Sequence, residues 1–159
     1  MNFIQHLKNR FGPAVLKTEE RQGQEILSVS PEHSRSIVRT LKTELAFDLL
    51  LDIVAIDWQN RVKPRFEVDY LFYKTEGAQR LTLKVSVAND NDPQLDSITD
   101  IFSSADWAER EVFDMMGIHF KNHPNLKRLL MWSDFQGHPL RKDYPIQRRQ
   151  PIPILDDIV

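Results

Sequence analysis

Residues 66–87 read FEVDYLFYKTEGAQRLTLKVSV and alternate between apolar and polar side chains over most of their length. Large apolar residues stand at every second position in two runs: Phe66, Val68, Tyr70 and Phe72 in the first, and Leu81, Leu83, Val85 and Val87 in the second. A period of two is typical of β-strands that bury one face. Glu76-Gly77 lies between the runs, so the sequence predicts two paired strands joined by a tight turn.

The residues before this hairpin alternate between helical and strand-like patterns. Apolar positions predict helices at 3–11 and, after Ser30-Pro31, at about 31–45, and strands at 15–18 and 25–30 around a turn containing Gly23. The aliphatic run from Leu49 to Trp58 suits a central strand that is covered on both faces. The order helix, two strands, helix, three strands predicts an α+β, two-layer domain with a mixed sheet and helices on one face.

Beyond residue 93 the pattern changes. A short helix is predicted at Trp107–Met116, with Asp106 as N-cap, Glu109 completing a capping box and Gly117 ending the helix. Five of the nine prolines follow: Pro124, Pro139, Pro145, Pro151 and Pro153. Proline lacks a backbone N–H donor and restricts the residue before it, so residues 121–159 should be extended and unable to form a core of their own. We therefore expect a core domain at 1–120 and an extended partner-binding segment at 121–159.

Composition excludes several classes of protein. Cysteine is absent, which excludes disulfides, thiolate-bound zinc and cysteine-bound iron–sulfur clusters from this chain. No apolar stretch has the length of a signal peptide or a transmembrane helix. Residues 1–120 carry 14 basic and 19 acidic side chains, whereas residues 121–159 carry 7 and 4. The C-terminal segment is therefore a basic surface, and we expect any membrane association to be indirect.

The predicted helix at 107–116 carries four charged residues, Glu109, Arg110, Glu111 and Asp114, which could form an acid/base cluster. An apolar stripe that includes Val112 and Met116 would bury one side of this helix. The spacing also allows an ion pair from Arg110 to Asp114. We therefore expect the charges to form a solvated or partner-facing surface.

Some residues are also compatible with two other functional classes, a metalloenzyme and a nucleic-acid-binding protein. His119, His123 and His138 could ligate a metal in a stand-alone metalloenzyme, although Gly117 and Pro124 interrupt the helix that an i, i+4 histidine pair requires. Basic residues near the C-terminus could contact nucleic acid, but interspersed aspartates and few aromatics argue against it. The residues alone favour an adaptor without its own active site.

Residues 107–130, WAEREVFDMMGIHFKNHPNLKRLL, and 135–145, FQGHPLRKDYP, closely resemble the signature of the respiratory complex I 30 kDa subunit family. Met116 and Asn122 depart from the commoner residues, Phe and Gly, without removing a charge or a proline. The resemblance marks these positions as family signature or partner interface: Glu109, Arg110, Glu111, Asp114, Gly117, His123, Pro124, Arg128, Gly137, His138, Pro139, Leu140, Arg141, Lys142, Asp143, Tyr144 and Pro145.

The resemblance implies a structural and assembly subunit of the quinone-reducing module of a proton-translocating NADH:quinone oxidoreductase. It implies a partner of the 49 kDa type, location at the cytoplasmic face of the bacterial inner membrane, and flavin, iron–sulfur clusters and quinone held by other subunits. No catalytic, cofactor or metal residue is expected in this chain. Related ferredoxin-dependent or hydrogenase-type membrane complexes remain an alternative. Because Pro139 and Pro145 extend the chain, Arg141 and Lys142 should not both turn toward their own domain.

Overall fold

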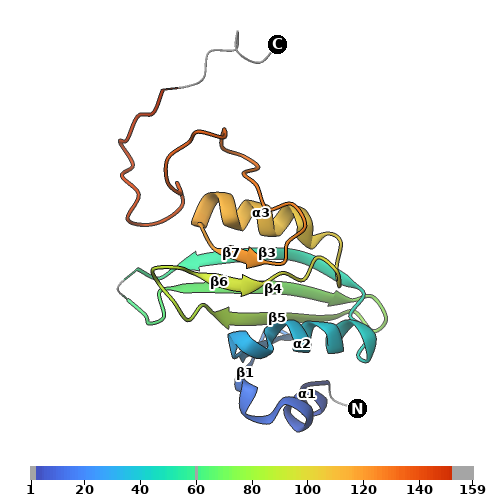
Figure 1. Cartoon of the computed structure of the whole chain (residues 1–159). Coiled ribbons are helices and arrows are strands. Elements are labelled where there is room, and N and C mark those ends of the chain that lie inside the picture. Colours follow the sequence, from blue (N-terminus) through green and yellow to red (C-terminus); the bar gives the residue numbers. More distant parts are fainter. Residues whose placement is uncertain (1–2, 60, 152–159) are drawn as a thin grey trace.

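The computed structural model describes residues 3–59 and 61–151, and its elements follow the predicted order (Figure 1). The bounds are α1 Phe3–Phe11, the 3-10 turn η1 Gly12–Ala14, β1 Val15–Arg21, β2 Gln24–Val29, α2 Pro31–Thr43, β3 Leu49–Asp57, β4 Phe66–Lys74, β5 Gln79–Ser86, β6 Gln94–Asp96, α3 Ala105–Met116 and β7 His119–Lys121. Both predicted hairpins are present, β1 with β2 and β4 with β5, which confirms the α+β class.

The main sheet has the strand order β1-β2-β5-β4-β3. β2 and β5 run parallel, whereas the other neighbouring pairs are antiparallel, so the sheet is mixed as expected. The strands β6 and β7 form a separate parallel pair that the sequence did not predict. Each has only three residues, too few for a period of two to be recognisable.

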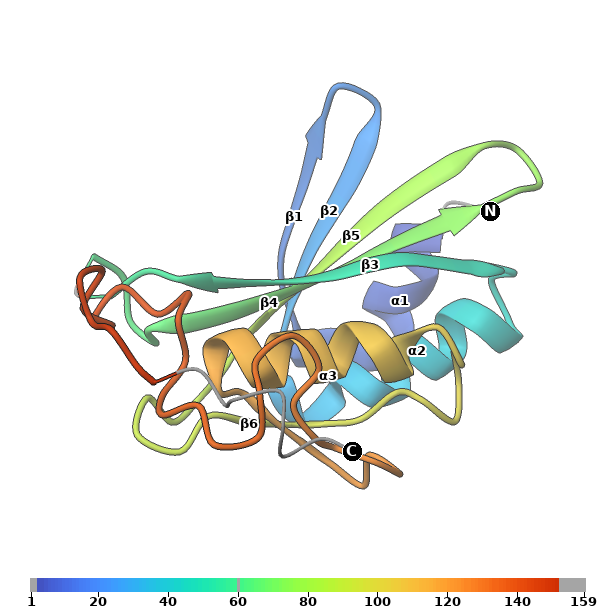
Figure 2. The same ribbon diagram turned by 90° about the horizontal axis from the view of Figure 1, so that it is seen from above.

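The core lies on one face of the main sheet. Leu27, Leu83, Tyr70 and Ile53 are register partners from β2 to β3, and all four are buried. Ile37, Val38 and Leu41 of α2 are fully buried in the same hydrophobic cluster. Figure 2 shows α2 and α3 on the same side of the strands, which confirms the two-layer arrangement.

The aliphatic run at 49–58 does not form a central strand, and that prediction is wrong. β3 is an edge strand, and Leu49, Leu51 and Val54 are between 41% and 53% exposed. An apolar run in the sequence is the same for a strand that is buried on both faces and for a strand whose outer side chains are exposed. Here only the residues that face the helices are buried, among them Leu50 and Ile53.

The start of α3 also differs from the prediction. The helix begins at Ala105, and Ser104 occupies the N-cap position without a side-chain cap hydrogen bond. Asp106 lies in the first turn, and Glu109 accepts the backbone N–H of Ile98 rather than closing a capping box. The end is as predicted, because Gly117 adopts a left-handed conformation with φ of 68°.

Gly117→Ala should destabilise the fold far more than Gly77→Ala. A Cβ at Gly117 would lie 2.5 Å from the His138 ring and 2.6 Å from Arg141 Nη2, whereas one at Gly77 would meet nothing within 4 Å. Both glycines have positive φ, so each alanine carries a backbone penalty of about 1 kcal/mol. We expect a further loss of about 2 kcal/mol at Gly117, measured by urea unfolding. Equal losses would show that the His138 and Arg141 side chains simply move aside.

Candidate functional site

One part of the signature meets around the carboxylate of Asp114, which is fully buried in α3. Its Oδ2 accepts the backbone N–H groups of Leu129, Leu130 and Met131 at 2.9, 2.7 and 2.8 Å. Its Oδ1 accepts Arg128 Nη1 at 2.6 Å. Burial alone would raise the pKa of Asp114, but these hydrogen bonds outweigh it and lower the pKa. The carboxylate is therefore held ionised and fixes residues 128–131 on the helix.

Arg128 also hydrogen-bonds to the loop around residues 135–137. Its Nη2 donates to the carbonyl oxygens of Phe135 at 2.8 Å and Gly137 at 3.0 Å. The Arg128 guanidinium thus joins Asp114 of α3 to the chain at Phe135 and Gly137. Its several N–H donors, held in one plane, can bridge groups that lie apart in this way. The Phe135 ring packs against Trp132 and Tyr144, with centroids 4.9 and 5.9 Å away.

His138 and Arg141 cover the C-terminal end of α3. Arg141 Nε donates to the Met116 carbonyl at 2.6 Å and Nη2 to the Gly117 carbonyl at 3.2 Å. His138 Nδ1 lies 2.9 Å from the Asp114 carbonyl, so this nitrogen carries the proton. Burial lowers the pKa of His138. These contacts satisfy carbonyls that a helix end leaves without intrahelical partners.

A second anchor lies at the end of β3 and was missed by the sequence analysis. The buried Asp57 accepts Arg65 Nε and Nη2 at 2.8 and 2.7 Å and the Lys142 backbone N–H at 2.9 Å. The Arg65 hydrogen bonds hold the pKa of Asp57 well below its usual range. Arg65 Nη1 also donates to Asp143 at 2.8 Å. The sequence did contain a signal for this anchor: Asp57 lies at the end of an apolar run, and Arg65 directly precedes the next predicted strand.

Arg141 and Lys142 point in different directions, as their sequence context predicted. Arg141 turns inward, lying 5.1 Å from the centre of the Phe66 ring, whereas the Lys142 residue is exposed. Through residue 151 the segment contains no helix or strand after β7, but turns at 135, 141, 144 and 148 replace the fully extended path that we expected. Within residues 128–131 and 138–143 the segment hydrogen-bonds to its own domain. Residues 152–159 of the predicted segment fall outside the described residues.

The predicted charged surface of α3 is largely wrong. Glu109 and Asp114 are 0% exposed and Arg110 is 7% exposed, so that only Glu111 of the four faces solvent. Arg110 does not pair with Asp114. It donates to the Lys127 and Arg128 carbonyls, both at 3.3 Å, and lies over the Trp107 ring.

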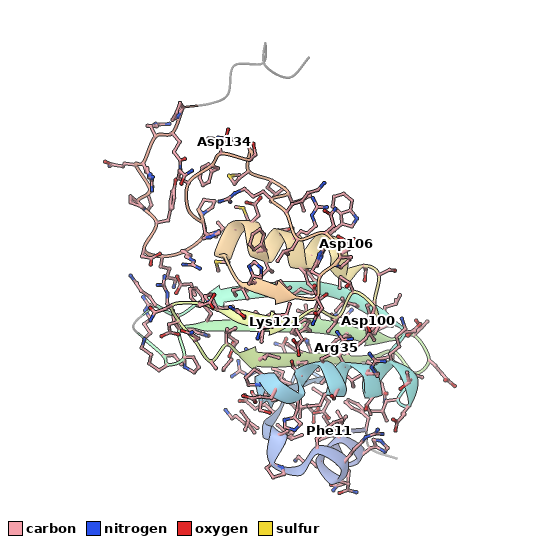
Figure 3. All side chains as sticks on the ribbon, in the orientation of Figure 1. Phe11, Arg35, Asp100, Asp106, Lys121 and Asp134 are labelled. Carbon is pink, nitrogen blue, oxygen red and sulfur yellow. The ribbon has the colours of Figure 1, made fainter. Side chains whose placement is uncertain are left out.

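Glu109 is fully buried and lies nearer the other end of α3. Its Oε1 accepts the Ile98 N–H at 2.8 Å, while Oε2 is buried without a hydrogen bond and lies 4.0 Å from His123 Nε2. Arg35 of α2 holds the adjoining loop through the Ser97 carbonyl and Asp100, as Figure 3 shows for Arg35 and Asp100. Burial raises the pKa of Glu109 to about 7, opposed in part by hydrogen bonds from Ile98 and Ser97.

The three histidines do not converge on a metal site. Both ring nitrogens of His123 have backbone partners, the Asp106 carbonyl at 3.1 Å and the Asn125 N–H at 3.0 Å. His119 is exposed and packs edge-on against Phe113. In the ranges 3–59 and 61–151, no group of three or more His, Cys, Asp or Glu side chains could hold a metal ion.

The remaining signature residues shape the outer loop. Tyr144 is half-buried, and its hydroxyl accepts a hydrogen bond from Gln150 Nε2 at 2.7 Å. Gly137 has a φ of 91°, which favours glycine, and a Cβ there would lie 3.1 Å from the Tyr144 ring. Pro139 is half-buried, whereas Pro124, Leu140 and Pro145 are exposed. The signature thus divides into residues that hold the loop and residues that present a surface.

Asp114→Asn should unfold the chain more readily. An amide nitrogen would face N–H donors, and the charge that pairs with Arg128 would be lost, so we expect a loss of about 3 kcal/mol in the free energy of unfolding. Glu111→Gln on the same helix is the matched control, with a change within about 0.5 kcal/mol. Urea unfolding of both variants measures the difference. A loss at Asp114 no larger than at Glu111 would contradict the role assigned to this carboxylate.

Glu109 should make stability fall as pH rises. Its pKa is raised from 4.5 to about 7, so the folded chain keeps a proton that the unfolded chain loses. The contribution is fully present below pH 4.5 and is lost as pH rises through 7, by at most about 3 kcal/mol. In Glu109→Gln this decline between pH 5 and 8 should flatten, measured by urea unfolding beside Glu111→Gln. Asp106, Arg35 and His123 also face the site and stay unchanged in both variants. An unaltered slope would rule out Glu109 as its source.

Comparison with known proteins gives the family. The profile for "Respiratory-chain NADH dehydrogenase, 30 Kd subunit" matches residues 27–150. The C subunit of the NADH-quinone oxidoreductase from Geobacter sulfurreducens is 43% identical over 141 residues, covering 89% of this chain and 86% of the relative. The protein of the same name from Rhodobacter capsulatus is 42% identical over 133 residues, covering 82% and 65%.

A solved structure supports the fold at lower identity. A chain in the structure of the membrane-bound sulfane sulfur reductase, an archaeal respiratory membrane complex, superposes with a TM-score of 0.76 at 22% identity, covering 91% of this chain and 85% of that one. None of the helices in the described part of the chain has the length and apolar character needed to span a membrane. The signature geometry around Asp114 and the match over residues 27–150 together place the chain in the respiratory-chain NADH dehydrogenase 30 kDa subunit family.

Proposed function

We propose that this chain is the 30 kDa-family component of a NADH-quinone oxidoreductase, where it supports electron transfer that other subunits carry out. Family membership over most of the chain is the observation that carries the proposal. The sequence contains no cysteine to bind an iron–sulfur cluster. We assign the flavin, the iron–sulfur clusters and the quinone site to neighbouring subunits, and this subunit acts by assembly within the quinone-reducing module.

The surface that would meet a partner lies on the outside of α3 and the loop that covers it. Large apolar side chains are exposed there: Trp107 at 62%, Leu130 at 56%, Leu140 at 57% and Ile146 at 100%. Residues 121–159 also carry a net charge of +3. An apolar surface with a basic surround fits a partner with apolar pockets and an acidic rim. We assign this partner as the 49 kDa-type subunit, with the assembly at the cytoplasmic face of the inner membrane.

Arg141 and Lys142 separate folding from assembly. Arg141→Ala removes two hydrogen bonds to the end of α3 and should lower the free energy of unfolding by about 2 kcal/mol. The exposed Lys142 should change stability by no more than about 0.5 kcal/mol when replaced by Ala. If Lys142 meets an acidic partner group, its loss weakens binding by about 2 to 5 kcal/mol. Urea unfolding of the isolated chains and recovery of the assembled complex from cells measure the two effects.

The same preparation tests the proposed function. Tagged wild-type chain should co-purify with flavin, iron–sulfur clusters and NADH:quinone activity, and the isolated chain should have none of these. Recovery of the native chain only as a free monomer would contradict the proposal. An assembly with iron–sulfur clusters that does not oxidise NADH would assign the chain to a ferredoxin-dependent or hydrogenase-type complex. Normal recovery of assembled Lys142→Ala would remove this residue from the interface.

A further inference from the structure

The outer edge of β3 offers backbone groups that the chain itself leaves largely unused. Trp58 N–H donates to the Arg65 carbonyl at 2.9 Å, so the backbone N–H of Trp58 faces β4 at the end of the β3–β4 ladder. Antiparallel ladders alternate, which turns the backbone groups of Ile56 and Val54 toward β4 and those of Ala55 and Ile53 outward. The Ile53 N–H is taken by the Asp52 carboxylate at 2.8 Å. Within residues 3–59 and 61–151, no hydrogen bond engages the outer groups of Ala55.

A groove of about 130 Å³ runs between this edge and α3. Its lining is mostly apolar: Ile53, Val54 and Ala55 from the strand, Val112, Met115 and Met116 from the helix, and Leu140 from the loop. Val54 is 41% exposed and Leu140 57% exposed. An extended segment that paired with β3 would lie along this groove and could place every second side chain in it.

The two edges of the sheet differ in how far they discourage such pairing. β1, the other edge, has charged side chains at four of its seven positions, which is a common protection of edge strands. β3 has nine residues, of which only Asp52 and Asp57 are charged. A register shift between Leu50 and Asp52 interrupts the strand, which leaves Asp52 to Asp57 as the regular part. The length available suits a partner strand of about five or six residues.

The negative charges beside the groove favour a partner segment that carries a positive charge. Asp52 and Glu111 are both exposed, and both line the groove. A second copy of this chain would bring its own Asp52 and Glu111 to the interface, and like charges at close range oppose pairing. A lysine or arginine on the incoming strand would instead find two carboxylates.

We propose that the edge of β3 binds an extended segment of another protein as a sixth strand, with apolar residues at alternate positions and a lysine or arginine opposite Asp52 and Glu111. This surface adjoins the outer face of α3, with which it shares Leu140, and the inference adds a second contact to the proposed function. Main-chain hydrogen bonds to Ala55 would hold the segment, and the groove would select its side chains.

Ala55→Pro tests the pairing directly. Proline removes the outward N–H and is tolerated on an edge strand, whereas Ala55→Ser keeps the N–H in a side chain of similar size. Each variant is expressed as the only copy of the chain in cells, and the fraction of it in the native complex is measured. We expect at least tenfold less assembled Ala55→Pro than Ala55→Ser, with the isolated proline variant still folded by circular dichroism. Normal assembly of folded Ala55→Pro would overturn the inference.

A second pair of variants decides the outcome if the proline variant fails to fold. Glu111→Lys reverses a charge on the rim of the groove, and Glu76→Lys makes the same change in the exposed β4–β5 turn. The first should reduce assembly at least tenfold and the second should not. Equal assembly of these two variants would overturn the inference.

A photo-crosslinking residue at the exposed Leu51 then identifies what lies beside the edge in the assembled complex. The expected product joins this position to a segment of a different chain that contains lysine or arginine between apolar residues. A crosslink to a second copy, or none, would overturn the inference. A wild-type chain found in no assembly would overturn the proposed function, whereas the proline result concerns only the β3 edge.

Discussion

The buried carboxylate of Asp114 is the constraint on which the C-terminal half of the structure depends. A charge removed from water is costly unless donors surround it. Three consecutive backbone N–H groups and the Arg128 guanidinium supply them, and the donors come from a segment that has no helix or strand to hold it. The carboxylate and the loop therefore stabilise one another, and neither arrangement is favourable alone.

The end of α3 extends the same logic to neutral groups. The carbonyls of the last helical turn need donors, and the loop provides His138 Nδ1 and two nitrogens of Arg141. These side chains come so close to Gly117 that a Cβ there would overlap both. A left-handed glycine therefore serves two purposes at this point: it ends the helix, and it leaves the space in which the covering side chains reach the helix carbonyls.

The spacing of apolar residues was enough to predict those strands and helices that bury one face and expose the other. The alternation at 66–87 gave the central hairpin because each strand has one buried and one outer face. It could not place β3, since the same aliphatic run fits an edge whose outer residues stay exposed. It also gave the wrong environment for Glu109, Arg110 and Asp114. Apart from side-chain donors such as the Arg128 guanidinium, their hydrogen-bond partners are backbone groups of Ile98 and residues 127–131. Every residue type except proline has both a backbone N–H and a backbone carbonyl, so such partners cannot be recognised in a sequence.

A dense family signature is easily interpreted as a contact surface, but much of this one is directed inward. Asp114, Arg128 and Arg141 use their charges within the chain, so replacing them would disturb assembly by disturbing the loop first. The residues that remain for other proteins are those with exposed side chains and no such role: Trp107, Leu130, Leu140 and the edge of β3. Because the loop carries Leu130 and Leu140, the buried charges that hold the loop control this part of the interface indirectly, by fixing the surface that a partner can recognise.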